Sequence, residues 1–505
     1  MNHTFWQWMA VTMAVVAIVH AIPMAAGYAH RGSTLVTGDV TEVQYSLLIN
    51  AAYRGESLAN PYLAGHENAP RYLPEMVERS LAGIAHLTGL KPLTVVAISR
   101  VGFPLGIAVL IAILGRTLGL SEGAAALAAL LATLGDPRNL VRVFDPSWLA
   151  FPRYFRAVSP GSHVLLFLLA LLAVERLRRR HPGAVRLPIR REAKWRHALL
   201  AGLALGVLFY TPLFYWTTAL AGTAWLALRA ATPQRLFLLA AIGIATLGAI
   251  PNAVQATAIA RDQSFQETLA RRALLTPGRA PDSFDGDALR VFCTGAIFLV
   301  FAVVLLRKQP AFTYLMPFMT AATLFAVQNA VTNRHLQSHH WVNCLIPLWA
   351  LIIATWLGKQ PQFLRAVPLM FCVVAAVSLA TVWVAAARAQ ARPPALYPLD
   401  TMKPQTIDWL RNHTAPGSVI FCAQPYAAEL RLFTQDKIYW GGQAEYFALS
   451  DAEVATRERD QGNWTPQTRW QLHYPADYYL GAAADCPDPL YKNPQENTCI
   501  IRIAR

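Results

Sequence analysis

Long apolar runs alternate with shorter polar connections over the first three-quarters of the chain. Eleven of these runs approach the ~20 residues that an α-helix needs to cross a bilayer. They are residues 8–28, 100–119, 122–135, 161–177, 198–211, 213–229, 236–256, 289–306, 312–331, 341–357 and 366–387. Because 122–135 and 198–211 are short enough to be broken or re-entrant, the predicted number is about 11. The pattern predicts a polytopic α-helical membrane protein with about 11 transmembrane helices.

The pattern changes after residue 387. A linker with Pro393 and Pro394 is followed by short apolar runs of β character at 419–422, 437–440 and 499–503, with helical stretches at 403–412 and 451–461. About 115 residues suffice for one small core. We therefore expect a transmembrane domain over 1–387, with a large first extracytoplasmic loop at 29–99, and a small C-terminal α/β extracytoplasmic domain over 388–505.

The excess of basic over acidic residues is confined to the apolar part of the chain. Residues 1–387 carry 32 Lys and Arg against 16 Asp and Glu, whereas residues 388–505 carry 12 against 13. The densest basic segment, 176–196, is predicted to be cytoplasmic by the positive-inside rule, and 229–235 falls on the same side if the spans alternate. No soluble basic domain remains to bind nucleic acid. If the C-terminal domain is extracytoplasmic, Cys486 and Cys499 are its most plausible disulfide.

Two carboxylates, Asp39 and Glu42, follow the first span and lie three residues apart. A charge at a bilayer edge is expensive unless it is paired, hydrated or chemically active. From Val40 onward, apolar residues recur at helical spacing, which predicts a helix on the outer membrane surface with its apolar face in the lipid boundary. Asp39 also fits the N-cap of that helix, with Glu42 at the third position. The capping role and a catalytic role are compatible.

Two further external segments contain clusters of polar and aromatic residues. In the first, Arg153 and Arg156 alternate with aromatic residues, which suits either a bidentate clamp on a lipid phosphate or an interfacial belt. In the second, Arg334, His335 and His340 suit phosphate or sugar contacts, with a plain surface turn or a metal site as the alternatives. Asp136 and Asp145 lie in the first segment, nine residues apart, so they do not form a D-x-D pair.

The first external segment resembles the GT-C superfamily of integral-membrane glycosyltransferases, which use lipid-phosphate-linked sugars. This group includes oligosaccharyltransferases, protein O-mannosyltransferases and aminoarabinose transferases. The matching residues are Asp39 after the first membrane helix, then Tyr45, Ala51-Ala52, Gly55 and Asn60-Pro61-Tyr62. The resemblance implies transfer of a sugar from a polyprenyl-phosphate donor to a lipid, glycan or protein acceptor at the outer face of the membrane. The Ala-, Leu- and Arg-rich composition favours a bacterial inner membrane, whose outer face is periplasmic.

The resemblance also implies roles for individual residues. Asp39 is the expected general base and Glu42 its helper. The donor phosphate is expected to contact the basic residues Arg153, Arg156, Arg334, His335 and His340. Substrates are expected to contact Tyr45, Tyr62 and Trp148. No cofactor is expected; the alternative is a divalent metal held by Asp39, Asp136 and Asp145.

Two other functions remain open from the sequence. A transporter or flippase predicts ionisable residues in the middle of spans and an inverted repeat of broken helices. The charges instead collect near the ends of the spans, and no repeat is visible. The third hypothesis is a non-catalytic cell-envelope assembly protein that retains the fold.

Overall fold

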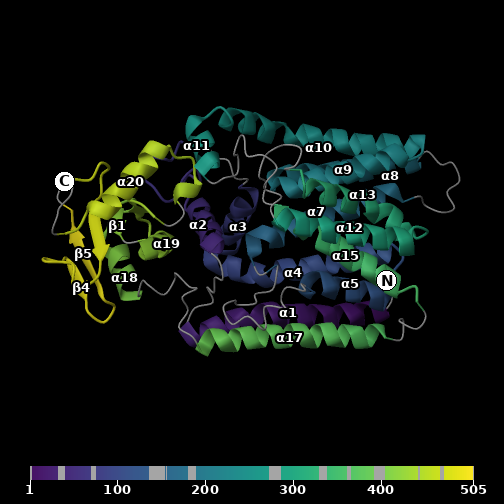
Figure 1. Cartoon of the computed structure of the whole chain (residues 1–505), viewed down its shortest axis with the longest axis horizontal. Helices are drawn as coiled ribbons and strands as arrows, with labels where there is room; N and C mark the ends of the chain where they lie inside the picture. The colour runs from purple at the N-terminus through teal and green to yellow at the C-terminus, as the bar shows by residue number, and fades with distance from the viewer. Residues whose placement is uncertain are drawn as a thin grey trace. The chain divides into compact units, whose positions relative to one another are not determined.

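The structure is a computed structural model that describes residues 3–31, 40–69, 75–135, 154, 156–179, 189–271, 286–328, 338–360, 366–391, 404–422, 424–441, 444–466 and 471–503. The chain forms two compact units (Figure 1). The helical unit comprises residues 1–35, 97–254 and 274–393, and the composite unit comprises residues 36–96, 255–273 and 394–505. The composite unit therefore joins the C-terminal segment to two segments that the sequence places between membrane helices.

The helical unit consists mainly of long helices. In chain order they are α1 (His3–Arg31), α4 (Pro92–Thr117), α5 (Glu122–Leu134), η2 (Ala157–Ser162), α7 (His163–Arg178), α8 (Ile189–Val207), η3 (Leu208–Tyr210), α9 (Leu213–Arg229), α10 (Thr232–Ile259), α12 (Gly286–Leu306), α13 (Pro310–Phe325), η4 (Ser338–Trp341), α15 (Val342–Leu357) and α17 (Val367–Ala391). Each of the apolar runs predicted from the sequence overlaps one of these helices.

Six helices in the described part of the chain are long and apolar enough to cross a membrane. These helical stretches are 3–26, 92–117, 157–178, 232–259, 288–306 and 367–384. The apolar helices α5 and α15 are shorter, with 13 and 16 residues. The chain is a multi-pass membrane protein, with six such helices among the described residues compared with about 11 predicted from the apolar runs.

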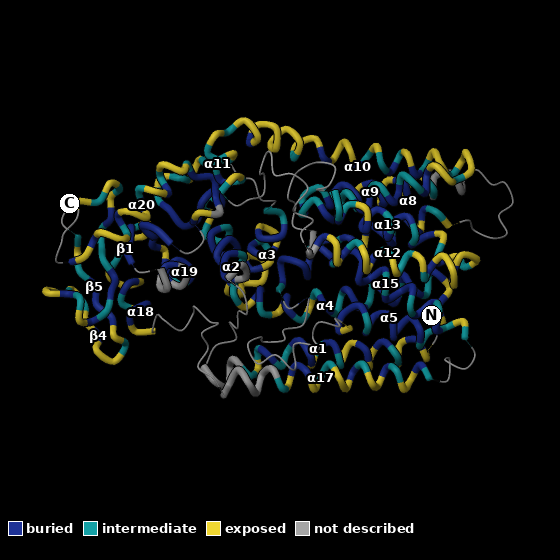
Figure 2. Tube along the Cα trace, in the orientation of Figure 1, coloured by how far each residue is buried: buried dark blue, intermediate teal, exposed yellow. Residues whose placement is uncertain are grey.

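Some helices are buried among other helices, and others expose apolar faces that suit contact with lipid. Helix α5 packs against α1, α15 and α17, and its alanines from Ala124 to Ala126 are completely buried. By contrast, α10 and α17 carry exposed positions along their length (Figure 2). Among these are Leu247 and Trp383, each 67% exposed. In water, such large exposed apolar surfaces are rare, so these faces are suited to contact lipid.

Small residues allow the helices to approach closely. At Gly222 of α9, an added Cβ atom would lie 2.2 Å from the ring of Phe318 on α13, so only glycine fits there. Interfaces of this kind are typical of membrane helix packing, where close van der Waals contact replaces the hydrophobic effect as the source of stability.

Basic residues meet at one end of the helical unit. The buried Glu175 near the end of α7 pairs with Arg178 at 2.6 Å and with Arg179 at 3.4 Å. Lys194 of α8 donates to the backbone oxygen of Arg179 at 2.8 Å, and Gln234 of α10 donates to that of Arg178. The described residues of the basic segments 176–196 and 229–235 therefore lie at the same end of the helical unit.

The composite unit contains a five-stranded mixed sheet. Its elements are α2 (Val40–Tyr53), α3 (Met76–Thr88), α11 (Gln263–Arg271), α18 (Pro404–His413), β1 (Val419–Cys422), α19 (Gln424–Phe433), β2 (Lys437–Ile438), η6 (Ala444–Tyr446), α20 (Asp451–Asn463), β3 (Tyr478–Gly481), β4 (Tyr491–Asn493) and β5 (Thr498–Arg502). The strand order is β2-β1-β3-β5-β4. Strand β1 pairs in parallel with β2 and β3, and β5 pairs antiparallel with β3 and β4.

The three strands and two helices predicted after residue 403 all occur, at β1, β2, β5, α18 and α20. The sequence pattern missed β3, β4 and α19. Strand β3 reads Tyr-Tyr-Leu-Gly, which is too short to show alternation, and β4 is a three-residue strand with an exposed lysine.

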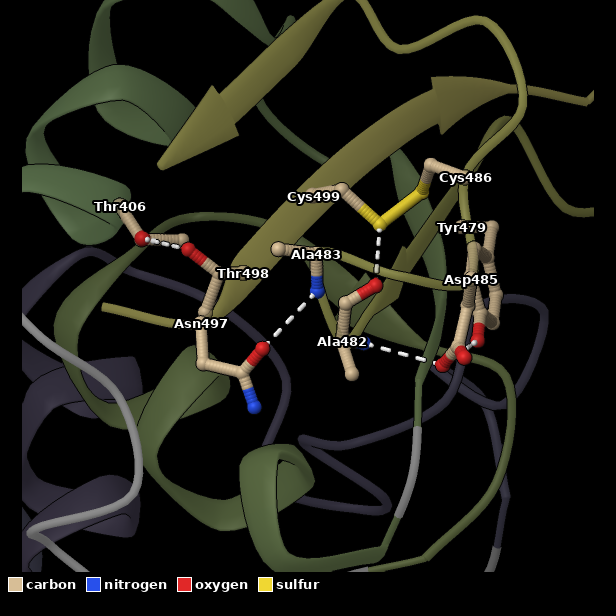
Figure 3. The surroundings of a disulfide bond; sticks show 9 residues. All are labelled: Thr406, Tyr479, Ala482, Ala483, Asp485, Cys486, Asn497, Thr498 and Cys499. Carbon is tan, nitrogen blue, oxygen red and sulfur yellow. Dashed lines mark hydrogen bonds between the residues drawn. A yellow bond between two sulfur atoms is a disulfide. The ribbon is translucent and has the colours of Figure 1, made fainter. Parts of the chain in front are cut away.

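The predicted disulfide between Cys486 and Cys499 is present (Figure 3). It joins the turn after β3 to strand β5, which already pairs with β3 from Tyr478 to Gly481. Neighbouring hydrogen bonds fix the same turn: the Ala482 amide donates to Asp485 at 3.2 Å, and the Ala483 amide donates to Asn497 at 3.3 Å. The disulfide therefore fastens a region that backbone pairing has already ordered.

Helix α2 differs from its expected surroundings. It packs against α3 and α19, and its apolar residues Val43, Leu47 and Ala51 are at most 1% exposed. The expectation that this face lies in the lipid boundary is wrong, because protein covers it. Periodicity shows that a helix has an apolar face but does not show what covers that face.

The hydrogen bonds that end helix α2 require a glycine at position 55. The Gly55 amide donates to the Ala52 oxygen at 3.1 Å, and the Glu56 amide donates to the Ala51 oxygen at 2.9 Å. Together these bonds form a Schellman motif, whose C′ residue adopts left-handed backbone angles. Gly55 has a φ of 71°, which costs little only for a residue without a Cβ atom.

Candidate functional site

The structure describes only part of the site predicted from the sequence. Outside the described residues lie Asp39, Asp136, Asp145, Trp148, Arg153, Arg334 and His335. Glu42 lies in the first turn of α2, and Tyr45 is half-buried one turn further on. Arg156 and His340 belong to the helical unit, and Tyr62 belongs to the composite unit.

Arg156 immediately precedes the η2 segment that leads into α7. Its backbone oxygen accepts a hydrogen bond from the Gly161 amide at 3.2 Å. A Cβ atom at Gly161 would lie 2.8 Å from that same oxygen, so this close turn requires glycine. The Ser162 hydroxyl donates to the Val158 oxygen at 2.6 Å within the same turn. These contacts hold the backbone of Arg156 at the start of α7.

Phe214, the second residue of α9, contacts the two aromatic rings that directly precede α15. The ring of His340 stacks on it with centroids 4.9 Å apart, and the ring of Trp341 meets it edge-on at 4.6 Å. The next residue, Tyr215, lies with its ring 5.6 Å from that of His163, the first residue of α7. His163 is buried, and its Nδ1 atom has no hydrogen-bond partner among the described residues.

These contacts bring the starts of α7, α9 and α15 to the same end of the helical unit. The N-terminus of an α-helix carries a partial positive charge and unsatisfied amide donors, so such ends favour anions. Arg156 precedes η2, the segment that leads into α7, and brings a positive charge to this part of the chain. His340 lies in η4, directly before α15, and brings an imidazole. The sequence identified Arg156 and the segment that contains His340 and Trp341, whereas His163 and Tyr215 emerged only from the packing.

Tyr62 is completely buried in the composite unit. Its ring contacts that of Phe447 with centroids 5.8 Å apart, and its backbone oxygen accepts from the Ile438 amide at 3.0 Å. Burial raises the pKa of its phenol well above the ordinary value. The side chain therefore packs the first external segment onto residues 438–447 and does not face solvent.

A charged cluster that the sequence did not single out surrounds Tyr62. The completely buried Arg431 of α19 donates hydrogen bonds to the Glu56 carboxylate and to the Pro61 oxygen. Arg54 donates to the same carboxylate at 2.5 Å, and the Lys437 ammonium lies 3.8 Å from it. Three cations thus share one carboxylate at the junction of two distant chain segments.

The charges in this cluster are shifted by burial and by one another. Burial opposes ionisation of Glu56, but the neighbouring cations Arg431, Arg54 and Lys437 lower its pKa below the ordinary value. Burial, together with the charge of Arg431, lowers the pKa of Lys437 to about 8. Glu56 is therefore an anion at neutral pH. Lys437 loses part of its positive charge as the pH rises slightly above neutral.

Glu78 of α3 is a second buried acid that the sequence pattern did not reveal. Its side chain is 3% exposed, and its Oε2 atom has no hydrogen-bond partner among the described residues. Burial, together with the nearby Glu75 carboxylate, raises its pKa to about 8. Glu78 is therefore largely protonated at neutral pH.

Within the described ranges, no three or more His, Cys, Asp or Glu side chains lie close enough together to hold one metal ion. The three acids named as the alternative metal ligands all lie outside those ranges.

Neither protein-family models nor curated protein sequences give a match to this chain. Solved structures do match it. ArnT from Cupriavidus metallidurans bound to undecaprenyl phosphate aligns with a TM-score of 0.61 at 12% identity, over 100% of this chain and 99% of that chain. The chain has the GT-C glycosyltransferase fold. This likeness confirms, at the level of the fold, the resemblance found in the first external segment.

Two other GT-C structures support the assignment of the fold. The archaeal oligosaccharyltransferase AglB from Archaeoglobus fulgidus, in complex with an inhibitory peptide and a dolichol-phosphate, aligns with a TM-score of 0.52 at 10% identity, over 95% of this chain and 70% of that chain. The mycobacterial arabinofuranosyltransferase AftD aligns with a TM-score of 0.52 at 16% identity. The alignment with AftD covers 95% of this chain and 35% of that chain.

Proposed function

We propose that this protein transfers a sugar from a polyprenyl-phosphate-linked donor to an acceptor at the periplasmic face of a bacterial inner membrane. The observation that carries the proposal is the alignment over the full chain with a GT-C structure bound to undecaprenyl phosphate. The acceptor is a hydroxyl or amine of a lipid, glycan or protein. In this proposal the composite unit, including residues 394–505, is periplasmic, and the basic end with Arg178 and Lys194 is cytoplasmic.

The helical unit contributes the site for the donor phosphate in this proposal. The leaving polyprenyl phosphate gains negative charge during transfer, so donors and cations placed around it stabilise the transition state. The meeting of the starts of α7, α9 and α15 beside Arg156 and His340 supports this role. Arg153, Arg334 and His335 are proposed as further phosphate contacts because they belong to the same two external segments.

The acceptor must lose a proton, and Asp39 is the proposed general base. Glu42 lies in the first turn of α2, where it is the proposed helper, and Tyr45 and Trp148 are the proposed substrate contacts. The mechanism needs no cofactor. The alternative is a divalent metal held by Asp39, Asp136 and Asp145. A chelation experiment distinguishes that mechanism from the metal-free one.

The test uses the full-length protein in lipid nanodiscs, supplied with radiolabelled undecaprenyl-phosphate sugars and a bacterial membrane extract. We expect label to appear in a new lipid, glycan or protein product, identified by mass spectrometry, and to require the enzyme. A parallel assay in liposomes measures movement of the labelled lipid between leaflets. Movement without a transfer product would favour a flippase and contradict the proposal.

A further inference from the structure

The composite unit contains a cavity that none of the proposed catalytic residues lines. Its volume is about 360 Å³, and its walls come from the segment after α2, the end of α18 and the connection from α19 to β2. The lining residues are Arg54, Arg411, Thr414, Pro416, Phe433, Thr434, Gln435 and Asp436. Specific small-molecule sites begin at about 300 Å³, so the cavity is large enough for a small ligand.

Two guanidinium groups give the cavity its charge. Arg54 donates to Glu56 at 2.5 Å and to the Thr434 oxygen at 3.3 Å, while its Nη2 atom has no hydrogen-bond partner among the described residues. Arg411 donates to the Phe433 oxygen at 2.7 Å and to Asp408 at 3.3 Å. Backbone oxygens thus orient both arginines, and these bonds use only two of the five N–H donors of each guanidinium, although the Arg54 Nη2 atom is itself buried.

The one acid in the lining is already engaged. Asp436 is almost completely buried, and its two carboxylate oxygens accept from the Thr414 hydroxyl at 2.9 and 3.1 Å. Burial raises its pKa to about 6, so part of its charge is lost in mildly acidic conditions. Arg54 and Arg411 are also paired with Glu56 and Asp408, but Glu56 is shared with Arg431 and Lys437. Positive charge is therefore in excess next to the cavity, which favours an anion.

The remaining lining residues suit a polyol better than a bare ion. Gln435 is exposed and offers both a donor and an acceptor for hydroxyl groups. Phe433 and Pro416 provide apolar surface for the C–H face of a sugar ring. The volume is also several times that of a phosphate ion, whose binding would leave most of the cavity unfilled.

We propose that this cavity binds an anionic saccharide, with the phosphate or carboxylate of the sugar held between Arg54 and Arg411. Arginine pairs bind both kinds of anion through charge-assisted, often bidentate hydrogen bonds. The inference concerns binding by the composite unit and does not depend on the transfer reaction.

Binding is tested on the full-length protein in nanodiscs by saturation-transfer NMR and calorimetry. The probes are glucose 6-phosphate, glucuronate, glucose and inorganic phosphate. We expect at least one of the two anionic sugars to bind at least tenfold more tightly than both glucose and inorganic phosphate. The comparison between the two anionic sugars identifies the preferred charged group. If inorganic phosphate binds as tightly as the sugars, or glucose does, the saccharide proposal is overturned.

Variants locate the binding. Arg411→Gln removes one charge-assisted contact and is expected to weaken binding of the anionic sugar by about tenfold or more. Gln435 is exposed, and Gln435→Ala is expected to lower the affinity for the sugars without changing the affinity for inorganic phosphate. Arg459→Gln is the matched control, because Arg459 is an exposed arginine on α20 outside the cavity. If both cavity variants bind like the control, the cavity is not the site.

Discussion

The guanidinium of Arg431, completely buried, donates a hydrogen bond to the carboxylate of Glu56, a residue 375 positions earlier in the chain. This pair joins the first external segment to α19 of the C-terminal segment. Asn50 reinforces the junction by donating to the Leu432 oxygen at 3.1 Å, and Arg54 does so by donating to the Thr434 oxygen at 3.3 Å. The end of α2 is therefore fixed by residues that the chain reaches only after its last membrane helix.

We expect Glu56→Gln to destabilise the composite unit by about 3 kcal/mol, because it leaves the buried Arg431 without an anion. Pulse proteolysis of the purified protein measures the loss. The double variant Glu56→Gln/Arg431→Met is expected to recover part of it, since no uncompensated charge remains. Glu458→Gln, an exposed position on α20, is the control. Equal stability of Glu56→Gln and the control would contradict a stabilising role for the pair.

Glu78 predicts a pH dependence of stability. Its pKa of about 8 in the folded protein lies above the ordinary value of 4.5, so the folded state holds the proton more tightly. Its contribution to stability is therefore complete below pH 4.5 and is lost as the pH rises to about 8. Glu78→Gln lacks this titration. We expect its stability relative to wild type to rise by about 3–5 kcal/mol between pH 5 and pH 9. A constant difference across that range would refute the assignment.

The disulfide between Cys486 and Cys499 spans 13 positions along the chain. Cross-links that close loops of about 15 residues stabilise proteins by about 3 kcal/mol. The double variant Cys486→Ser/Cys499→Ser is expected to lower the stability of the composite unit by roughly that amount, measured by protease resistance of residues 404–503. Cys372→Ser, at an exposed free cysteine, is the control and should match wild type.

Asp39→Asn is expected to reduce sugar transfer by at least about 100-fold while leaving expression and thermal stability unchanged, because it removes the proposed general base. Glu42→Gln should have a smaller effect. Asp408→Asn, an exposed carboxylate on α18, is the matched control. Transfer by Asp39→Asn at the wild-type rate would eliminate Asp39 as the base.

Arg156→Gln is expected to raise the KM for the polyprenyl-phosphate donor by about tenfold or more, because a charge-assisted phosphate contact is lost. Arg156→Lys should restore part of the affinity. Arg116→Gln, in the last turn of α4, provides a control arginine. An unchanged KM in Arg156→Gln would remove this residue from the donor site.

Chelation separates the proposed reaction from its metal-dependent alternative. Incubation with EDTA followed by desalting is expected to leave the transfer rate unchanged. A loss of activity that Mg²⁺ or Mn²⁺ reverses would instead assign Asp136 and Asp145 to a metal site with Asp39.

Local pattern was enough to predict the apolar helices, the helices α2, α18 and α20, and three of the five strands. The apolar runs mark where helices can form, and Gly55 marks the end of α2, because both depend on neighbours within a few residues. The same reasoning missed β3 and β4, which are only four and three residues long. Their pairing with β5 depends on register with a strand further along the chain.

The amino-acid sequence alone was sufficient to predict the helical membrane architecture, the excess of basic residues in its apolar part and the GT-C resemblance of the first external segment. It also placed Arg156 and His340 among the candidate phosphate contacts. The folded chain was needed to show that protein covers α2, that Tyr62 is buried, and that Arg431 pairs with Glu56. This division arises because hydrophobic periodicity shows which face of an element avoids water. The partner that covers the face, or that neutralises a buried charge, is chosen by packing between segments far apart in the chain.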